Sequence, residues 1–196
     1  MTKSVINEGN LVPNVEIIFR ENGEFVSKFT NDIFKPYKSY VIFSLPGAFT
    51  PTCSAYQLPG FEDKYEEFKA LGIEEVYCIS VNDGFVMNAW AKDQGIEKVK
   101  MIPDGNGYFT RAMDQLVLKS NLGFGQRSWR YAAVIDGGFI EKLFIEPGKS
   151  DNYSEDPYVE STPEKVIEYL VSTAKPEQLQ SYNEYLQKKF PAPAFP

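Results

Sequence analysis

An apolar run that leads at once into a turn and a helix start is the feature that most constrains this chain. Residues 40–45, Tyr-Val-Ile-Phe-Ser-Leu, are typical of a buried strand, and residues 46–49, Pro-Gly-Ala-Phe, of a tight turn. Thr50 is a good N-cap, and Pro51 suits the first helical position, where its missing N–H has no cost. The segment therefore predicts a buried strand that passes through one turn into a helix.

Cys53 falls in the first turn of this predicted helix. Unpaired backbone N–H groups and the positive end of the helix dipole favour an anion there. We expect a thiol in that position to be partly thiolate at neutral pH and reactive. The alternative is an inert, half-buried cysteine, because free cysteines usually behave as small hydrophobic groups. The spacing alone does not decide between the two.

The chain has two cysteines and no histidine among its 196 residues, which excludes several kinds of site. A Cys–His or Ser–His dyad and a His-containing metal site are ruled out, and two cysteines do not make a zinc site. Cys78 lies within the apolar run 76–81, which predicts a buried core thiol too far from Cys53 for a disulfide. Any activation of Cys53 must then come from the helix dipole, backbone N–H groups, a hydroxyl or an arginine.

The net charge of the chain argues against some classes of binding partner. Its formal net charge is −7 without a basic block, so we expect it to bind neither nucleic acid nor anionic membranes. It has no run of about 18 apolar residues that would span a bilayer. Residues 1–8 lack an apolar signal core, so we expect a reducing, cytoplasmic location.

Strand and helix patterns alternate along the chain. The predicted strands are 15–21, 24–29, 40–45, 76–81, 99–102, 131–135 and 139–145. The predicted helices start near residue 50 with a kink at Pro59-Gly60, and continue as 61–71, 82–95, 109–116, 161–170 and 177–189. This order predicts an α/β, thioredoxin-like fold, a mixed central sheet with helices on both faces.

Three further segments are a C-terminal tail, a glycine-rich turn and an acidic loop. We expect residues 1–175 to form one domain and residues 176–196 a polar helical tail, which either docks through a narrow apolar stripe or remains a frayed, solvated terminus. Residues 103–107, Pro-Asp-Gly-Asn-Gly, fit no phosphate-loop pattern and predict a turn. The acidic residues 151–160 lack EF-hand spacing and predict a solvated loop.

Four separated motifs resemble those of one known family. They are Pro46 to Cys53 with Leu58-Pro59, Ser80 to Met87, Pro103 to Gly107, and Arg127-Ser128-Trp129-Arg130-Tyr131. In this order they resemble the peroxiredoxins, whose peroxidatic motif is Pro-x-x-x-Thr-x-x-Cys, and most closely the type II, peroxiredoxin-5-like subfamily. The resemblance runs from about residue 10 to about residue 172.

The resemblance implies a role for each matching residue. Cys53 would be the peroxidatic nucleophile, and Thr50 would hydrogen-bond the thiolate and the peroxide oxygens. Pro46 would shield the site from water. Arg130 would stabilise the thiolate and the leaving oxygen, as suits a permanently charged group, and Arg127 would be a supporting or surface residue.

The resemblance also implies an activity. The chain is expected to reduce hydrogen peroxide and alkyl hydroperoxides without a cofactor, forming a sulfenic acid on Cys53. No cysteine stands at the later position of a resolving thiol, so a one-Cys mechanism is expected. Residues 128–131 and 141–148 most resemble bacterial members that use glutathione and glutaredoxin. Gln57 departs from the pattern, because relatives often have His there, but the other site positions are present.

The resemblance also implies an oligomeric state, and two alternative functions remain open. A homodimer is expected through loops that carry Phe49, Phe85 and Phe124. One alternative function is a peroxide sensor or relay, in which Cys53 passes its oxidation to a partner protein. Another is a redox-inactive binding module, which slow reaction with peroxide would favour.

Overall fold

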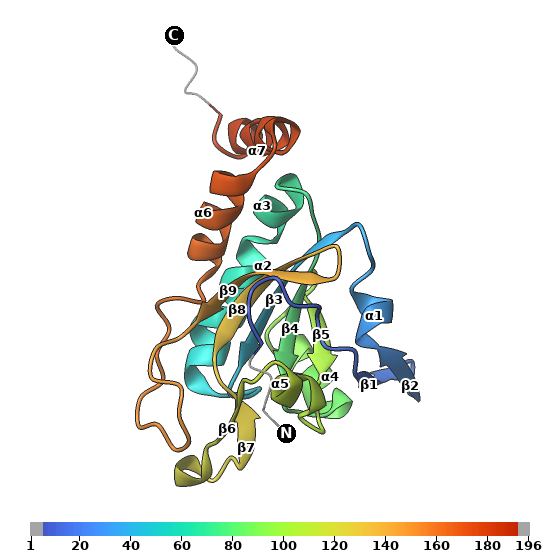
Figure 1. Cartoon of the computed structure of the whole chain (residues 1–196), viewed down its shortest axis with the longest axis vertical. Coiled ribbons are helices and arrows are strands. Elements are labelled where there is room, and N and C mark those ends of the chain that lie inside the picture. The colour runs from blue at the N-terminus through green and yellow to red at the C-terminus, as the bar shows by residue number, and fades with distance from the viewer. Residues whose placement is uncertain (1–5, 192–196) are drawn as a thin grey trace.

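The computed structural model describes residues 6–191 and contains a central five-stranded sheet (Figure 1). Its strands follow the order β5-β4-β3-β8-β9, in which β3, β4 and β5 run parallel, β8 is antiparallel to β3, and β9 is antiparallel to β8. Their bounds are β3 Ser39–Leu45, β4 Ile73–Ser80, β5 Lys100–Pro103, β8 Tyr131–Asp136 and β9 Phe139–Ile145. The predicted mixed sheet is confirmed. Residues 192–196 of the predicted tail lie outside the described residues.

Two small hairpins and the helices complete the chain. The hairpin strands are β1 Glu16–Glu21 with β2 Glu24–Phe29, and β6 Leu116–Leu118 with β7 Gln126–Ser128. The α-helices are α1 Thr30–Ile33, α2 Leu58–Asp63, α3 Tyr65–Ala70, α4 Gly84–Asp93, α5 Tyr108–Ala112, α6 Pro163–Thr173 and α7 Pro176–Lys189. A π-helix, Cys53–Gln57, precedes α2, and a short 3-10 turn occupies Ser120–Leu122.

The sheet has a hydrophobic core on each face. Successive residues of a strand point to opposite faces, so Phe43 of β3 packs on one side and Ile42 on the other. The Phe43 side is covered by α2, α3, α4 and α6, where the rings of Phe43 and Phe61 stack with centroids 4.0 Å apart. The other side packs against α5 and residues near α1. Burial on both faces explains the continuous apolar run of β3.

Several predicted boundaries were wrong. The predicted helix 61–71 is divided at Lys64, whose φ and ψ of −93° and 0° separate α2 from α3. The predicted helix 109–116 ends at Ala112, because Asp114 takes a left-handed φ of 55° and Leu116 begins β6. The strand pair β6–β7 was not predicted, because neither three-residue strand has a recognisable pattern of its own.

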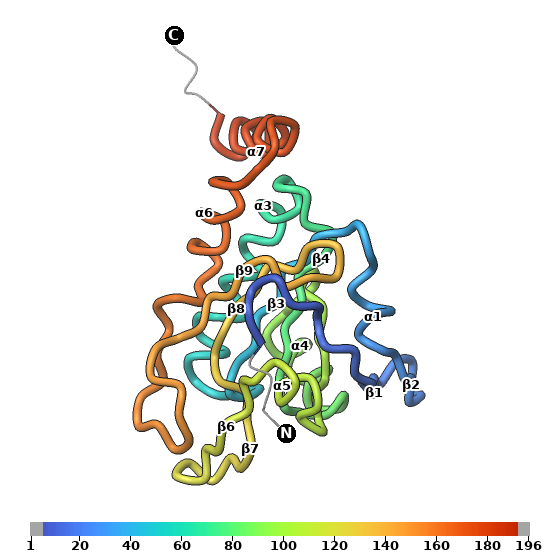
Figure 2. Tube along the Cα trace, in the orientation of Figure 1, coloured from blue at the N-terminus to red at the C-terminus, as the bar shows by residue number. Residues whose placement is uncertain are grey.

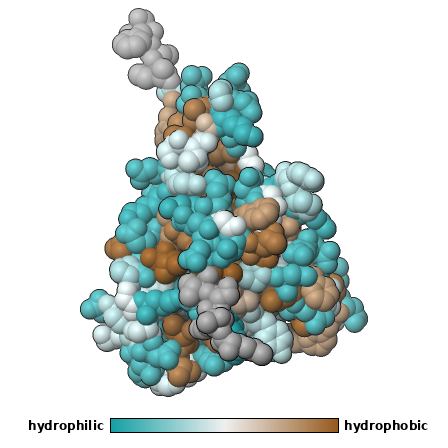
Figure 3. Space-filling model, viewed as in Figure 1, coloured by the Kyte–Doolittle hydropathy of each residue, from teal (hydrophilic) through white to brown (hydrophobic). Residues whose placement is uncertain are grey.

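The predicted tail forms α7, which lies past the ends of α6 and α3 and contacts α3 (Figure 2). Its Gln178 side-chain amide donates to the Leu71 carbonyl at 2.8 Å, and Tyr182 and Lys189 donate to the Glu67 carboxylate at 3.2 and 3.1 Å. Of the two alternatives for this segment, docking is correct. Hydrophobic side chains remain visible between polar ones over α7 (Figure 3). The division of the chain at residue 175 stays a prediction.

Within residues 6–191, each helix is too short or too polar to cross a bilayer.

Candidate active site

The turn after β3 directs the chain into the predicted helix. Phe49 takes a left-handed φ of 62°, and the backbone N–H of Ala48 donates to the side chain of Asn82, after β4, at 3.0 Å. The Thr50 carbonyl accepts the backbone N–H of Ser54 at 3.0 Å, so a helical turn begins where predicted. The Thr50 hydroxyl, however, donates to the carbonyl of Gly47 at 2.8 Å rather than serving as a side-chain cap.

Cys53 begins the π-helix, and its carbonyl accepts the backbone N–H of Leu58, five residues on. At the predicted kink, the helix is therefore widened into the π-helical turn Cys53–Gln57, and α2 begins directly after it at Leu58. Within this turn Cys53 and Gln57 lie on one face, and both side chains are fully buried. The indole N–H of Trp90, from α4, donates to the Ser54 hydroxyl at 3.0 Å and anchors the segment.

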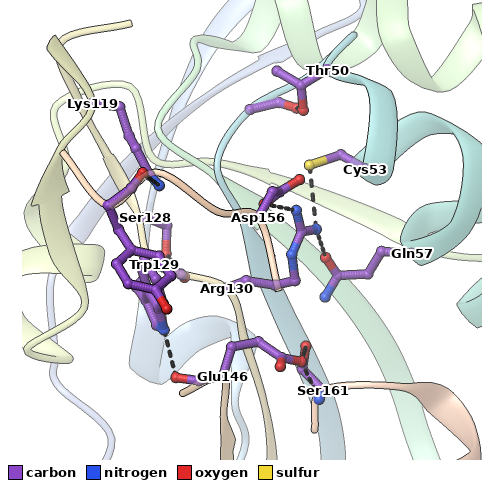
Figure 4. A network of polar contacts seen from close by, with 12 residues as sticks. Thr50, Cys53, Gln57, Lys119, Ser128, Trp129, Arg130, Glu146, Asp156 and Ser161 are labelled. Carbon is purple, nitrogen blue, oxygen red and sulfur yellow. Dashed lines mark hydrogen bonds and ion pairs between the residues drawn. The ribbon is translucent and has the colours of Figure 1, made fainter. Parts of the chain in front are cut away.

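Arg130 reaches Cys53 from the residue just before β8, the strand next to β3. Because β8 is antiparallel to β3, with Tyr131 opposite Ser44, the start of β8 meets the end of β3. The Arg130 Nη1 lies 3.5 Å from the Cys53 Sγ (Figure 4). In this view the sulfur lies between Arg130 and Thr50. Pro46 is buried at the start of the turn. The fold thus brings Thr50, Cys53 and Arg130 together, with Pro46 at the start of the same turn.

The Arg130 guanidinium is held at both terminal nitrogens. Nη1 also donates to the Gln57 Oε1 at 2.5 Å, and Nη2 forms an ion pair with the Asp156 carboxylate. The side chain is 1% exposed. Burial disfavours its charge, but the electrostatic interactions and hydrogen bonds with Cys53 and Asp156 outweigh this, and the pKa of Arg130 is raised. A permanent cation therefore faces the sulfur, where it can stabilise a thiolate.

Arg127 has different partners. Its Nη1 donates to the Val81 carbonyl at 3.1 Å and its Nε to the Phe124 carbonyl at 3.0 Å. These bonds tie β7 to the end of β4, in keeping with the supporting role expected for Arg127. The two arginines thus differ in the way that the motif comparison indicates.

Cys78 lies in the interior of β4, opposite Phe43 of β3. Both cysteines are free and buried. Burial, and secondarily the charge of Cys53, raises the pKa of the Cys78 thiol well above its ordinary value. A thiol that ionises so poorly is a weak nucleophile at neutral pH.

Comparisons with known proteins agree with this geometry. Residues 7–161 match the family model described as Redoxin. The chain is 60% identical over 141 residues to a peroxiredoxin of Sinorhizobium fredii, covering 72% of this chain and 74% of that one. It is 57% identical over 147 residues to a peroxiredoxin of Rhizobium etli, with 75% and 82% covered. The chain belongs to the peroxiredoxin family.

Solved peroxiredoxins have the same fold. A 1-Cys peroxiredoxin of Plasmodium falciparum, an antioxidant protein, superposes with a TM-score of 0.81 at 40% identity, covering 86% of this chain and all of that one. Peroxiredoxin 5 of Alvinella pompejana gives a TM-score of 0.65 at 33% identity, with 74% and 92% covered. As a peroxiredoxin, the protein is a peroxidase, an oxidoreductase with a thioredoxin-like fold.

Two side chains of this peroxiredoxin's site were not predicted. Gln57 was noted only as a departure from the family pattern, although its spacing of four from Cys53 on one helix indicates a shared face. Asp156 belongs to the stretch 151–160, which was predicted to be a solvated loop. The stretch is an exposed loop, as predicted, but the prediction gave no role to Asp156, which pairs with Arg130, or to Asp151, which accepts the backbone N–H of Leu118 at 2.8 Å.

Proposed function

We propose that the protein reduces hydrogen peroxide and alkyl hydroperoxides by a one-Cys mechanism, with Cys53 as the nucleophile. The observation that carries the proposal is the buried guanidinium of Arg130, whose Nη1 lies 3.5 Å from the Cys53 Sγ. In a buried site, such a cation favours the thiolate and stabilises developing negative charge.

The chemical step needs only groups of this chain and the peroxide. The Cys53 thiolate attacks the terminal oxygen of ROOH, forming the S–O bond as the O–O bond breaks. The product is Cys53–SOH, and RO⁻ leaves, takes a proton and becomes ROH. Arg130 stabilises the leaving oxygen. The Thr50 hydroxyl, whose own proton goes to Gly47, has lone pairs left to accept the peroxide O–H.

Recycling then requires a thiol from another molecule. The position of Cys78 inside β4 and its raised pKa make it a poor resolving thiol. The similar 1-Cys peroxiredoxin of Plasmodium falciparum supports the same mechanism. We propose glutathione with glutaredoxin as the reductant, in the cytoplasm, on the resemblance of residues 128–131 and 141–148. Because the Cys53 side chain is fully buried, the site must open before a second thiol reaches it.

The test compares the single variants Cys53→Ser and Cys78→Ser. We expect Cys53→Ser to abolish peroxidase activity, and Cys78→Ser to retain most of it and gain one oxygen on Cys53, measured by mass spectrometry. Equal loss of activity in a folded Cys78→Ser protein, or quantitative formation of an intramolecular disulfide, would contradict the one-Cys mechanism. Steady-state turnover with glutathione and glutaredoxin separates a peroxidase from a relay that requires a partner protein.

A further inference from the structure

The ion pair between Asp156 and Arg130 joins the active site to a long loop. The loop, residues 146–162, connects β9 to α6 and carries Asp156 to the Arg130 Nη2. The Asp156 side chain is 45% exposed, whereas Arg130 is almost completely buried. Asp156 therefore joins the exposed loop to Nη2 of the catalytic guanidinium, whereas Cys53 and Gln57 contact Nη1 (Figure 4).

Hydrogen bonds on both sides of Asp156 fix the loop. On the C-terminal side, the Glu146 carboxylate, 1% exposed, accepts backbone N–H groups of Val159, Glu160 and Ser161 at 2.7–3.0 Å and the Ser161 hydroxyl at 2.8 Å. On the N-terminal side, the backbone N–H of Asn152 donates to the Leu118 carbonyl at 2.7 Å. Asp156 is thus presented by a segment anchored at two points.

The contact between Asp156 and Nη2 affects the orientation of the whole Arg130 guanidinium. The group is planar and rigid, so holding Nη2 sets the direction of Nη1. Asp156 holds Nη2 while Gln57 accepts from Nη1, which leaves Nη1 pointing at the Cys53 Sγ. Arg130 Nε is buried without a hydrogen-bond partner among the described residues, so it does not contribute to this orientation.

Charge alone would give Asp156 the opposite effect. A carboxylate near Cys53 disfavours a thiolate and offsets part of the Arg130 cation. Besides Arg130, Lys119 interacts electrostatically with the Asp156 carboxylate. Its Nζ lies 5.1 Å from the centroid of the Trp129 ring and donates to the Tyr153 carbonyl at 3.4 Å. Removing the Asp156 charge should therefore leave the thiolate fraction of Cys53 unchanged or raise it.

We propose that Asp156 is a positioning residue, which aims Arg130 at Cys53 and at the peroxide oxygen, with the loop 146–162 as its rigid support. The proposal rests on the proposed roles of Cys53 and Arg130. It predicts a separation of two quantities. Loss of Asp156 slows the reaction of the thiolate with peroxide, although it does not reduce the amount of thiolate.

The experiment compares Asp156→Ala, Asp156→Asn and the control Glu155→Ala, all in the full chain with Cys78→Ser. Glu155 is exposed and adjacent, so its variant makes a similar change in charge and loop composition. Two quantities are measured from pH 4.5 to 8.5: thiolate absorbance at 240 nm, and the second-order rate constant for sulfenic acid formation with hydrogen peroxide. Near-UV circular dichroism checks that the variants are folded.

We expect Asp156→Ala to lower the limiting rate constant about tenfold, because small errors in the placement of a catalytic group have large effects. Its thiolate fraction at each pH should be unchanged or higher. Asp156→Asn, whose amide oxygen can still accept from Nη2, should recover part of the rate. The control variant should stay within about twofold of the parent.

Three results would overturn the proposal. They are an unchanged rate in Asp156→Ala, a rate loss explained by a smaller thiolate fraction, and an equal loss in Glu155→Ala. If Cys53 of the parent protein does not oxidise, the proposed function fails first and this proposal with it. If the parent oxidises normally and one of the three results is found, this proposal alone fails.

Discussion

Replacement of Arg130 by Met tests the central interaction of the site. Two unit charges 3.5 Å apart, the distance of Nη1 from Sγ, interact by about 5 kcal/mol at an effective dielectric constant of about 20. Removing one charge-assisted donor from a dry site usually costs about 10²–10³-fold in rate, or about 2.7–4 kcal/mol. We therefore expect the second-order rate constant of Cys53 with hydrogen peroxide to fall about 10²–10³-fold in Arg130→Met.

The assay counts one chemical event. Protein carrying Cys78→Ser reacts with hydrogen peroxide in a quenched-flow instrument, a thiol alkylator stops the reaction, and mass spectrometry measures the fraction of Cys53 with one added oxygen. Arg127→Met is the matched control, because Arg127 is a nearby, partly buried arginine whose guanidinium donates to the carbonyls of Val81 and Phe124 and not to Cys53. Arg130→Lys keeps the charge but loses the two-ended fork, so an intermediate rate is expected.

The role of Arg130 is refuted if Arg127→Met is the slower variant, or if folded Arg130→Met stays within threefold of the parent. In the first case the two arginines have been assigned in the wrong order. In the second case the guanidinium contributes little to the chemistry, and the helix N-terminus and Thr50 must activate the sulfur without it.

Three further predictions concern the rest of the molecule. Deleting residues 176–196 removes the contacts of α7 with Leu71 and Glu67 but no group at Cys53, so the rate constant with peroxide should stay within about threefold. The free energy of unfolding should fall by about 2 kcal/mol, which lowers the melting temperature by about 4–8 °C. A much larger fall in the rate constant, with the remainder folded, would show that α7 shapes the site. Burial alone would raise the pKa of Glu67, but hydrogen bonds from Lys189 and Lys64 lower it below its ordinary 4.5, so this stabilisation is complete above pH 4.5 and is lost as the pH falls below it. Lys189→Ala should accordingly lower the melting temperature at pH 7 but not at pH 3, and scanning calorimetry that found equal losses at both would contradict the assignment. Phe49 and Phe85, 54% and 57% exposed, are expected to anchor a homodimer, which light scattering at micromolar protein tests against a monomer of about 22 kDa.

Much of the local structure could be read from the sequence, because it depends on neighbouring residues. Asn22-Gly23 adopts positive φ at both positions and closes the β1–β2 hairpin, as predicted. Asp83 caps α4 by accepting the backbone N–H groups of Phe85 and Val86. The apolar run of β3, the turn and the helical position of Cys53 follow from the same short-range preferences of strand, proline and N-cap residues.

The composition of the active site depended on the tertiary structure as well. The motif resemblance selected Cys53 and Arg130 correctly as neighbours, but the sequence contains no local signal for Asp156, which lies 26 residues after Arg130 and in another loop. Its contact exists only because β8 runs antiparallel to β3 and the loop after β9 folds back over the start of β8.

The sequence by itself determined the strand–turn–helix that carries Cys53, the alternating order of elements and the absence of any histidine from the chemistry. Only the tertiary structure decided which side chains hold Arg130, where Glu146 anchors the loop and whether α7 docks on α3. The physical reason is the range of the forces involved. Backbone preferences act over a few residues, whereas the partners of a buried charge are chosen by packing among segments far apart in the chain.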